Sequence, residues 1–321
     1  MAVTRYEQVS LFPSNKPRAG RLTDQEHYIP ARRLAESPLV GITFMLMATM
    51  VMFPTMNASV KYLAAEGYPY GQIVWARYFG HLVFMVVAFM PMRGWQLFRT
   101  ERPVIQGVRS FLLFACTALY FFAIQHIDLT VAASISFTSP ILVTALSVPF
   151  LGEKVGIRRW LAVTVGFAGA MIIIRPGGEG FHWAMLLVVL NTVCYAFYQL
   201  LTRKIASNDN PETTITLTAV FGAIAASFFL LNGMMMPVSA LHWAIFIGMG
   251  ALGGFGHYMV VKAFQYTEAS VVSPFSYGQL VGATFFSFVL FDTFPDQWTW
   301  IGAAIVVASG LYIASREQKK R

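Results

Sequence analysis

Arg77 and His81 are the residues of this sequence best suited to bind a charged ligand within an apolar segment. They stand four residues apart in the segment 72–90, so an α-helix places both side chains on one face. An arginine near the bilayer centre is costly, so Arg77 is a candidate counter-ion for a substrate or for a gate. The alternative is that Arg77 extends to the outer membrane interface beside Trp75 and Tyr78.

Polar side chains also recur at helical spacing in other apolar segments. Asn191, Tyr195 and Gln199 stand at positions i, i+4 and i+8, so one helix presents them as a single polar stripe. Such a stripe faces protein or water rather than lipid. Asn57 in the first apolar segment and His257 in the eighth are further candidate substrate contacts. Structural hydrogen bonding between helices is the alternative for all of them.

The segment 135–153 is apolar, yet it contains prolines and several hydroxyl residues. Pro140 removes one helical hydrogen bond and clashes with the preceding turn, so we expect a kink or a break near it. Phe137 stands just before this proline, and Tyr277 occupies the matching place 140 residues later. We predict that Phe137 and Tyr277 form aromatic walls or gates of a central cavity. Packing of both rings against neighbouring helices or lipid is the alternative.

Acidic residues are excluded from the central part of every apolar segment. The predicted interior is therefore neutral to positive, which suits a zwitterionic or anionic substrate better than an organic cation. The sequence also has no phosphate-binding glycine loop, no residues at metal-site spacing and no convergent catalytic set. These absences predict no enzyme, no cofactor and no metal site.

The elements that carry these residues are predicted from composition. Of the 321 residues, 56% are hydrophobic and only 12% are charged, too few charges for a water-soluble domain of this length. The apolar residues form blocks of about 17–25 residues, the length at which a helix crosses a membrane. The fold class is therefore all-α integral membrane. The ten predicted transmembrane helices are 39–61, 72–90, 107–125, 131–150, 158–174, 183–201, 213–231, 242–264, 271–291 and 298–314.

Basic residues are distributed unevenly about these spans. With the amino terminus in the cytoplasm, 19 of the 23 lysines and arginines fall in cytoplasmic segments, Arg109 among them. This bias follows the positive-inside rule and predicts that both termini are cytoplasmic. A nucleic-acid-binding surface would gather its charges on one folded face, so the net charge of +8 does not indicate a nucleic-acid partner.

The two ends of the chain and its cysteines carry no further predicted chemistry. Residues 1–36 are polar and lack the apolar core of a signal peptide, so a disordered cytoplasmic tail is predicted. Residues 316–321 form a second, basic cytoplasmic tail. Cys116 and Cys194 stand in separate spans and fit neither a metal spacing nor a disulfide framework, so both are predicted to be small packing residues.

The chain consists of two similar halves. A shift of 140 residues places Gln125 on Gln265 and Trp160 on Trp300, and a shift of 142 places Pro69 on Pro211. Five spans are repeated, and because five is odd the second copy must cross the membrane in the opposite sense. Such an inverted repeat is typical of secondary transporters, whose substrate site lies near the midplane between the two copies.

The motifs of the first half resemble those of a known family. The pattern A-x-x-S-F-x-x-P opens the fourth span, and L-G-E closes it before R-R-W. The chain therefore resembles the EamA family of the drug/metabolite transporter superfamily. The residues that carry the motif are Ala133, Phe137, Pro140, Gly152, Glu153 and Trp160. The second half departs from it, since Leu280 replaces the proline and Asp292-Thr293 replaces Gly-Glu.

This resemblance implies a first repeat at 37–176, a second at 181–315, and secondary transport of a small metabolite. With the charges of the spans, we expect a zwitterionic or anionic organic metabolite, such as an amino acid or a related compound, to cross the bacterial inner membrane by alternating access. The alternatives are a flippase of a lipid-linked substrate and, less favoured, a non-transporting membrane sensor or enzyme. The expected partners are this metabolite and membrane lipids. The oligomeric state stays open, a homodimer included.

Overall fold

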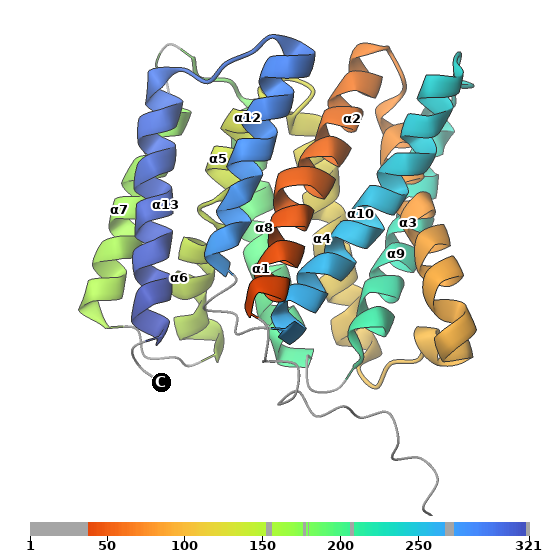
Figure 1. Cartoon of the computed structure of the whole chain (residues 1–321), viewed down its shortest axis with the longest axis horizontal. Helices are drawn as coiled ribbons and strands as arrows, with labels where there is room; N and C mark the ends of the chain where they lie inside the picture. Colours follow the sequence, from red (N-terminus) through yellow and green to blue (C-terminus); the bar gives the residue numbers. More distant parts are fainter. Residues whose placement is uncertain are drawn as a thin grey trace, which may run out of the picture. The chain divides into compact units, whose positions relative to one another are not determined.

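Long apolar segments form helices here because a backbone in lipid must satisfy its own hydrogen-bonding groups. The computed structural model describes residues 38–151, 156–175, 178, 180–205, 209–266 and 273–318 (Figure 1). All of them belong to a unit formed by residues 34–321, and the chain's other unit is 1–33. Within the described residues the regular structure is helical and contains no strand. This agrees with the predicted all-α membrane class.

The helices of the two halves follow one another in the same order. In the first half they are α1 (Pro38–Leu46), η2 (Met47–Met52), α2 (Phe53–Ala65), α3 (Tyr70–Arg93), η3 (Gly94–Phe98), α4 (Pro103–Ala123), α5 (Leu129–Ser136), α6 (Ser139–Leu151) and α7 (Ile157–Ile174). In the second half they are α8 (Ala184–Ile205), α9 (Pro211–Ser227), η4 (Phe228–Asn232), α10 (Ala240–Tyr266), η5 (Ser273–Tyr277), α12 (Gly278–Phe291) and α13 (Gln297–Gln318).

Six helices of the described chain are long and apolar enough to cross a membrane. They are Leu39–Ala65, Tyr70–Phe98, Pro103–Ala123, Ala184–Thr202, Pro211–Leu231 and Ala240–Val260. Three shorter apolar helices, Leu129–Val143, Trp160–Ile174 and Phe275–Phe291, coincide with the predicted fourth, fifth and ninth spans. The structure thus supports a multi-pass membrane protein, whereas the number of ten spans stays a prediction.

Four predicted spans are not continuous α-helices, and the seventh of the ten ends in the 3₁₀ segment η4. The first contains a π-helical turn, η2, immediately before Pro54, and such turns often occur at functional sites. The fourth is interrupted at Phe137 and Thr138, and α6 restarts with Pro140 as its second residue, where a proline is tolerated. In the ninth, Tyr277 is the last residue of the 3₁₀ segment η5 and directly precedes α12. The repeat-related residues Phe137 and Tyr277 therefore both lie at breaks between helical segments.

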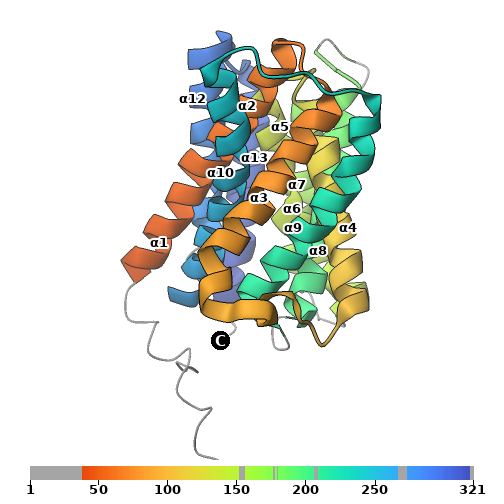
Figure 2. The same ribbon diagram turned by 90° about the vertical axis from the view of Figure 1, so that its right-hand side faces the viewer.

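Helices of one half pack mainly against helices of the other, and the contacts occur in repeat-related pairs (Figures 1 and 2). Helix α3 packs on α10, as its counterpart α9 packs on α4. Helix α4 packs on α8, as α10 packs on α1 and α2. The pairs α3–α9, α5–α12 and α7–α13 are each formed by an element and its own repeat counterpart. This arrangement agrees with the two-repeat organisation read from the sequence.

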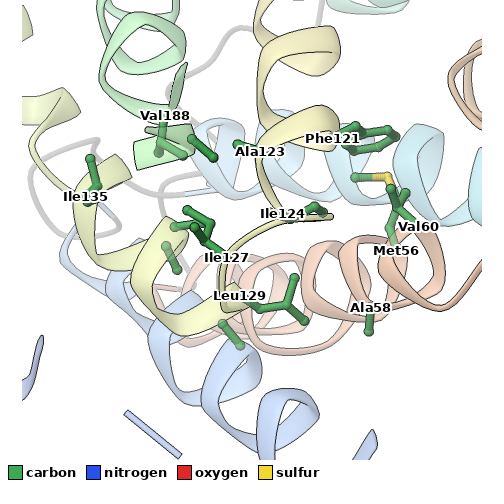
Figure 3. Packing of buried hydrophobic residues seen from close by; sticks show 14 of the residues in the cluster. Met56, Ala58, Val60, Phe121, Ala123, Ile124, Ile127, Leu129, Ile135 and Val188 are labelled. Atoms are coloured by element: carbon green, nitrogen blue, oxygen red, sulfur yellow. The ribbon is translucent and has the colours of Figure 1, made fainter. Parts of the chain in front are cut away.

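The buried core follows the same interface between the halves. Its apolar side chains include Met56 and Val60 of α2, Phe121 of α4, Leu129 of α5 and Val188 of α8, which converge in Figure 3. Glycines bring α3 and α10 together at the depth of His81. A Cβ atom on Gly250 would lie 2.4 Å from the Cα of Gly80, and one on Gly254 would lie 2.8 Å from the His81 ring. The α3–α10 crossing therefore holds the polar residues of both helices in contact.

Candidate functional site

The structure brings Arg77, His81 and His257 together between α3 and α10. Arg77 is 2% exposed and His81 is 1% exposed. Nη2 of Arg77 donates to Nε2 of His257 over 3.4 Å, and the His81 and His257 rings stack with their centroids 6.1 Å apart. Arg77 therefore points into the bundle, and the interfacial alternative considered from the sequence does not describe its position.

The contact between Arg77 and His257 determines which nitrogen of the histidine carries the proton. A guanidinium has donors only, so Nε2 of His257 must accept and the ring is neutral with its proton on Nδ1. Phe53 of α2 packs on the same imidazole, with ring centroids 5.1 Å apart. One ring nitrogen and one ring face of His257 are thus engaged by α3 and α2.

Several donors of this cluster are buried without a partner. Nε and Nη1 of Arg77 and both ring nitrogens of His81 form no hydrogen bond with any described residue. No ion pair involves Arg77 in the described part of the chain. A buried guanidinium with two free nitrogens is costly, because each unmet donor loses its hydration. The arrangement can bind an acceptor-rich or anionic group without first breaking a salt bridge.

Arg109 is a second buried arginine, and its burial was not predicted from the sequence. The residue was counted with the cytoplasmic basic residues, at the start of the predicted span 107–125, and in the structure it lies inside α4 and is 1% exposed. Its Nη1 and Nη2 atoms donate to Oγ1 of Thr218 over 3.1 and 3.0 Å, and Nη2 also donates to the carbonyl of Thr214 over 3.0 Å. Neutral acceptors of α9 therefore hold the guanidinium.

The missed signal was Pro103, which starts α4 six residues before Arg109. Proline is frequent in the first helical turn, so a helix beginning there would have carried Arg109 into the bundle. Tyr198 was also missed. Its ring centroid lies 4.8 Å from the guanidinium carbon of Arg109, and its ring stacks on that of Tyr195 at 5.6 Å. The predicted residue Tyr195 therefore stacks on Tyr198, and Tyr198 makes the cation–π contact with Arg109.

The other predicted polar residues occupy different parts of the interface. Nε2 of Gln199 donates to Oγ of Ser139 over 3.1 Å, which joins α8 to α6. Asn57 is buried on α2, one turn after Phe53. Gln199 thus makes an interhelical hydrogen bond of the kind considered as its structural alternative. Asn57 lies on the helix whose Phe53 reaches His257.

Phe137 and Tyr277 contact each other directly. Their rings meet edge to face, with centroids 5.1 Å apart and an interplanar angle of 80°. The hydroxyl of Tyr277 is directed at α13, where a Cβ on Gly310 would collide with it. The pair joins the breaks of the two repeat-related spans. Its role as a gate stays a prediction.

Two grooves lie away from these polar residues, on the outer surface. The first, of about 420 Å³, runs between α7 and α13 and includes Arg158. The second, of about 350 Å³, is lined by apolar side chains of α12 with Thr284, Phe294 and Trp300. The described residues contain no group of three or more potential metal ligands. Neither groove is lined by Arg77, His81 or His257, so the cluster of these three residues lies apart from both grooves.

Comparison with known proteins is consistent with this architecture. The profile of the EamA-like transporter family matches residues 40–175 and 182–315, which are the two halves of the chain. A solved structure described only as "Crystal structure of protein" superposes with a TM-score of 0.57 at 18% identity, covering 84% of this chain and 98% of its own. That similarity supports the fold alone.

Several bacterial transporters are similar over nearly their whole length. A riboflavin transporter of Vibrio cholerae is 29% identical over 285 residues, 88% of this chain and 95% of its own. An S-adenosylmethionine uptake transporter of Rickettsia bellii is 26% identical, with 87% and 95% covered. A pseudopaline exporter of Pseudomonas aeruginosa is 24% identical, with 87% and 97% covered.

These matches and the apolar helices identify the class of protein. The matched relatives are transporters of small metabolites, not enzymes, and the helices support a multi-pass protein of the bacterial inner membrane. Because the family profile covers both halves of the chain, this protein is a member of the EamA-like transporter family, within the drug/metabolite transporter superfamily.

Proposed function

We propose that this protein moves a zwitterionic or anionic organic metabolite across the inner membrane, with Arg77, His81 and His257 as the contacts for its negatively charged group. The observation that carries the proposal is the set of free, buried donors on Arg77 and His81. Arg109 adds a second positive charge to the bundle. A carboxylate or phosphate oxygen would replace the hydration these groups have lost.

The charges of the spans limit the possible substrates more than the relatives do, because the relatives differ in what they transport. Their names give riboflavin, S-adenosylmethionine and pseudopaline as substrates, and they include both uptake and export. The absence of acidic residues from the central parts of the spans disfavours an organic cation without an acidic group. An amino acid or a related compound fits this charge requirement, and so do larger metabolites that carry a carboxylate.

We further propose that transport proceeds by alternating access of two inverted five-helix repeats, with ten spans and cytoplasmic termini. Hydrogen bonds between helices and loops close the bundle at both ends, and these two closures support the mechanism. At the predicted external end, the side-chain amide of Gln72 exchanges two hydrogen bonds of 2.8 Å with the backbone of Met235. At the predicted cytoplasmic end, Asp209 accepts hydrogen bonds from the α3–α4 loop and from α4. Opening one end while the other stays closed would expose the cluster to one side at a time.

Counterflow into proteoliposomes tests the proposed function. The panel should contain amino acids, organic acids, nucleosides, riboflavin and S-adenosylmethionine, with empty liposomes as the reference. We expect exchange of at least one compound that carries a carboxylate or phosphate. Uptake no greater than in empty liposomes for every compound of this class would contradict the proposed substrate class.

Variants of Arg77 test the proposed site once a substrate is found. Arg77→Gln removes the charge, and we expect at least a tenfold rise in KM, since charge-assisted hydrogen bonds contribute about 1.5–3 kcal/mol. Arg77→Lys keeps the charge but not the planar donor set, and an intermediate KM is expected. Arg93→Gln is the matched control, because Arg93 pairs with Glu212 near the end of the bundle. An unchanged KM in Arg77→Gln at normal membrane abundance would exclude this site.

A further inference from the structure

The outer groove between α7 and α13 combines an apolar channel with one arginine at its end. Its floor is formed by the buried residues Ala162 and Ser309, and the Ser309 hydroxyl donates to the Ala162 carbonyl. Leu161, Val165 and Tyr312 form exposed walls. Arg158 lines the groove from the first turn of α7. In Figure 1, α7 begins at the end of the bundle at which α13 ends.

Small residues explain why the groove is restricted to this end of the helix pair. Further along α7 the two helices touch, since a Cβ on Gly302 would lie 2.6 Å from the Gly169 carbonyl oxygen. Towards Arg158 the short side chains of Ala162 and Ala308 line a space of about 420 Å³ that the two helices leave unfilled. In a membrane, an apolar channel open to the outside is filled by hydrocarbon chains rather than water.

The two ends of the α7–α13 pair differ in charge pairing. At one end, Arg175 forms an ion pair of 2.6 Å with Asp296. At the other end, Arg158 is exposed, and among the carboxylates whose side chains the structure describes none lies within ion-pair distance of it. Arg158 also occupies the amino-terminal turn of α7, where the helix dipole favours an anion. An anionic group at the mouth of the groove would complement this end of the pair.

We propose that this groove is a binding site for an anionic phospholipid, with an acyl chain between α7 and α13 and its headgroup phosphate on Arg158. The distance along α7 from Arg158 to Val165 is about 10 Å, enough for the upper part of an acyl chain. Basic residues at the cytoplasmic ends of membrane helices are a common means of holding such headgroups. The groove lined by α12 has no charged residue and serves as the internal comparison.

Native mass spectrometry of the full-length protein in mild detergent tests this site. The probes are phosphatidylglycerol and phosphatidylcholine with identical acyl chains. We expect preferential retention of phosphatidylglycerol, and Arg158→Gln should weaken its binding about fivefold, the effect of one basic residue at a membrane surface. Arg99→Gln, which removes an exposed arginine of the α3–α4 loop, is the matched control and should bind as the unmodified protein does.

Filling the groove gives an independent measurement. Ala308→Trp should reduce retention of both phospholipids, whereas Val281→Trp in the uncharged groove should leave the preference for phosphatidylglycerol intact. Equal retention of the two phospholipids by the unmodified protein, or unchanged binding in Arg158→Gln, would overturn the proposal. A lipid-free two-copy species that Ala308→Trp dissociates would also overturn it, since a second copy would then occupy the groove.

Discussion

The carboxylate of Asp209 accepts a hydrogen bond of 2.7 Å from the side-chain amide of Gln106, which closes the start of α9 onto α4. Thr100 and the backbone N–H of Glu101 donate to the same carboxylate. At the opposite end of the bundle, Gln72 of α3 holds the α9–α10 loop through Met235. Gln106 also donates to Oγ1 of Thr214 over 3.0 Å, and the sequence repeat places Gln72 on Thr214, so the two closures involve repeat-related residues of α3 and α9.

Breaking one closure should favour opening at that end. Asp209→Ala removes the acceptor for the α3–α4 loop, and we expect labelling of a cysteine at Ser110, buried on α4, to become about fivefold faster, which corresponds to about 1 kcal/mol. The measurement uses a small water-soluble maleimide in a background without Cys116 and Cys194. Gln72→Ala is the control from the other end and should not increase this rate. Equal acceleration in both variants would argue against separate closures.

The pH dependence of the same closure follows from the pKa of Asp209. Partial burial raises this pKa, but the hydrogen bonds from Thr100 and Gln106 outweigh it and hold the pKa below its ordinary value of 3.8. The closed state therefore binds the proton less well than the open state, so closure is favoured above that ordinary value and lost as the pH falls through the closed-state pKa. Divided by the rate in Asp209→Ala at the same pH, which removes the titration of the thiol itself, labelling at Ser110→Cys should be constant from pH 8 to about 5 and rise below about 4. An increase in this labelling rate already at pH 6, or an increase that persists in Asp209→Asn, would show that another group titrates.

Thr218 should matter more for stability than Thr216, which stands two residues earlier in α9. Thr218→Val removes the hydroxyl that accepts both terminal nitrogens of Arg109, and a loss of about 1–3 kcal/mol in the free energy of unfolding is expected. Thr216→Val is the matched control, because its hydroxyl bonds only the carbonyl of Glu212 in its own helix. Unfolding in detergent, followed by circular dichroism, compares the two. Equal losses of unfolding free energy in the two variants would show that the Thr218 hydroxyl stabilises only its own helix, without a contribution from its contact with Arg109.

The edge-to-face contact predicts coupling between Phe137 and Tyr277. A double-mutant cycle of Phe137→Ala and Tyr277→Ala should give an interaction free energy of about 0.5–1.5 kcal/mol in unfolding experiments. Tyr277→Phe keeps the ring and should preserve the coupling. If the pair also forms a wall or gate of the cavity, each alanine variant should change KM at normal membrane abundance. Folded variants with unaltered KM and rate would leave the pair a purely structural contact.

The orientation of the chain is predicted from its charge distribution. With both termini cytoplasmic, an impermeant thiol reagent applied to intact cells should label Glu179→Cys but neither Arg5→Cys nor Lys319→Cys. Permeabilised cells supply the control, since all three positions should then react. Labelling of either terminus in intact cells would reverse the predicted orientation.

Properties that depend only on residues close together in the sequence, or on the similarity of two segments, could be predicted from the sequence. The length of the apolar blocks predicts membrane helices, and the 140- and 142-residue shifts predict two related halves. The spacing of Arg77 and His81 predicts one helix face, and both residues lie together in the structure. Each of these inferences uses only the period of a helix or the similarity of two segments, so none needs a tertiary contact.

The tertiary structure decided which polar groups meet. Arg77 and His257 are 180 residues apart, and their contact depends on the close approach of α3 and α10 at Gly80 and Gly250. Arg109 looked cytoplasmic because the end of a span cannot be located within a turn from hydropathy alone, and only its packing on α9 showed that it is buried. The sequence by itself therefore determined the class of protein and the faces of its helices. The partners across the repeat interface were decided by helix packing, because crossing positions depend on side-chain volumes from both halves at once.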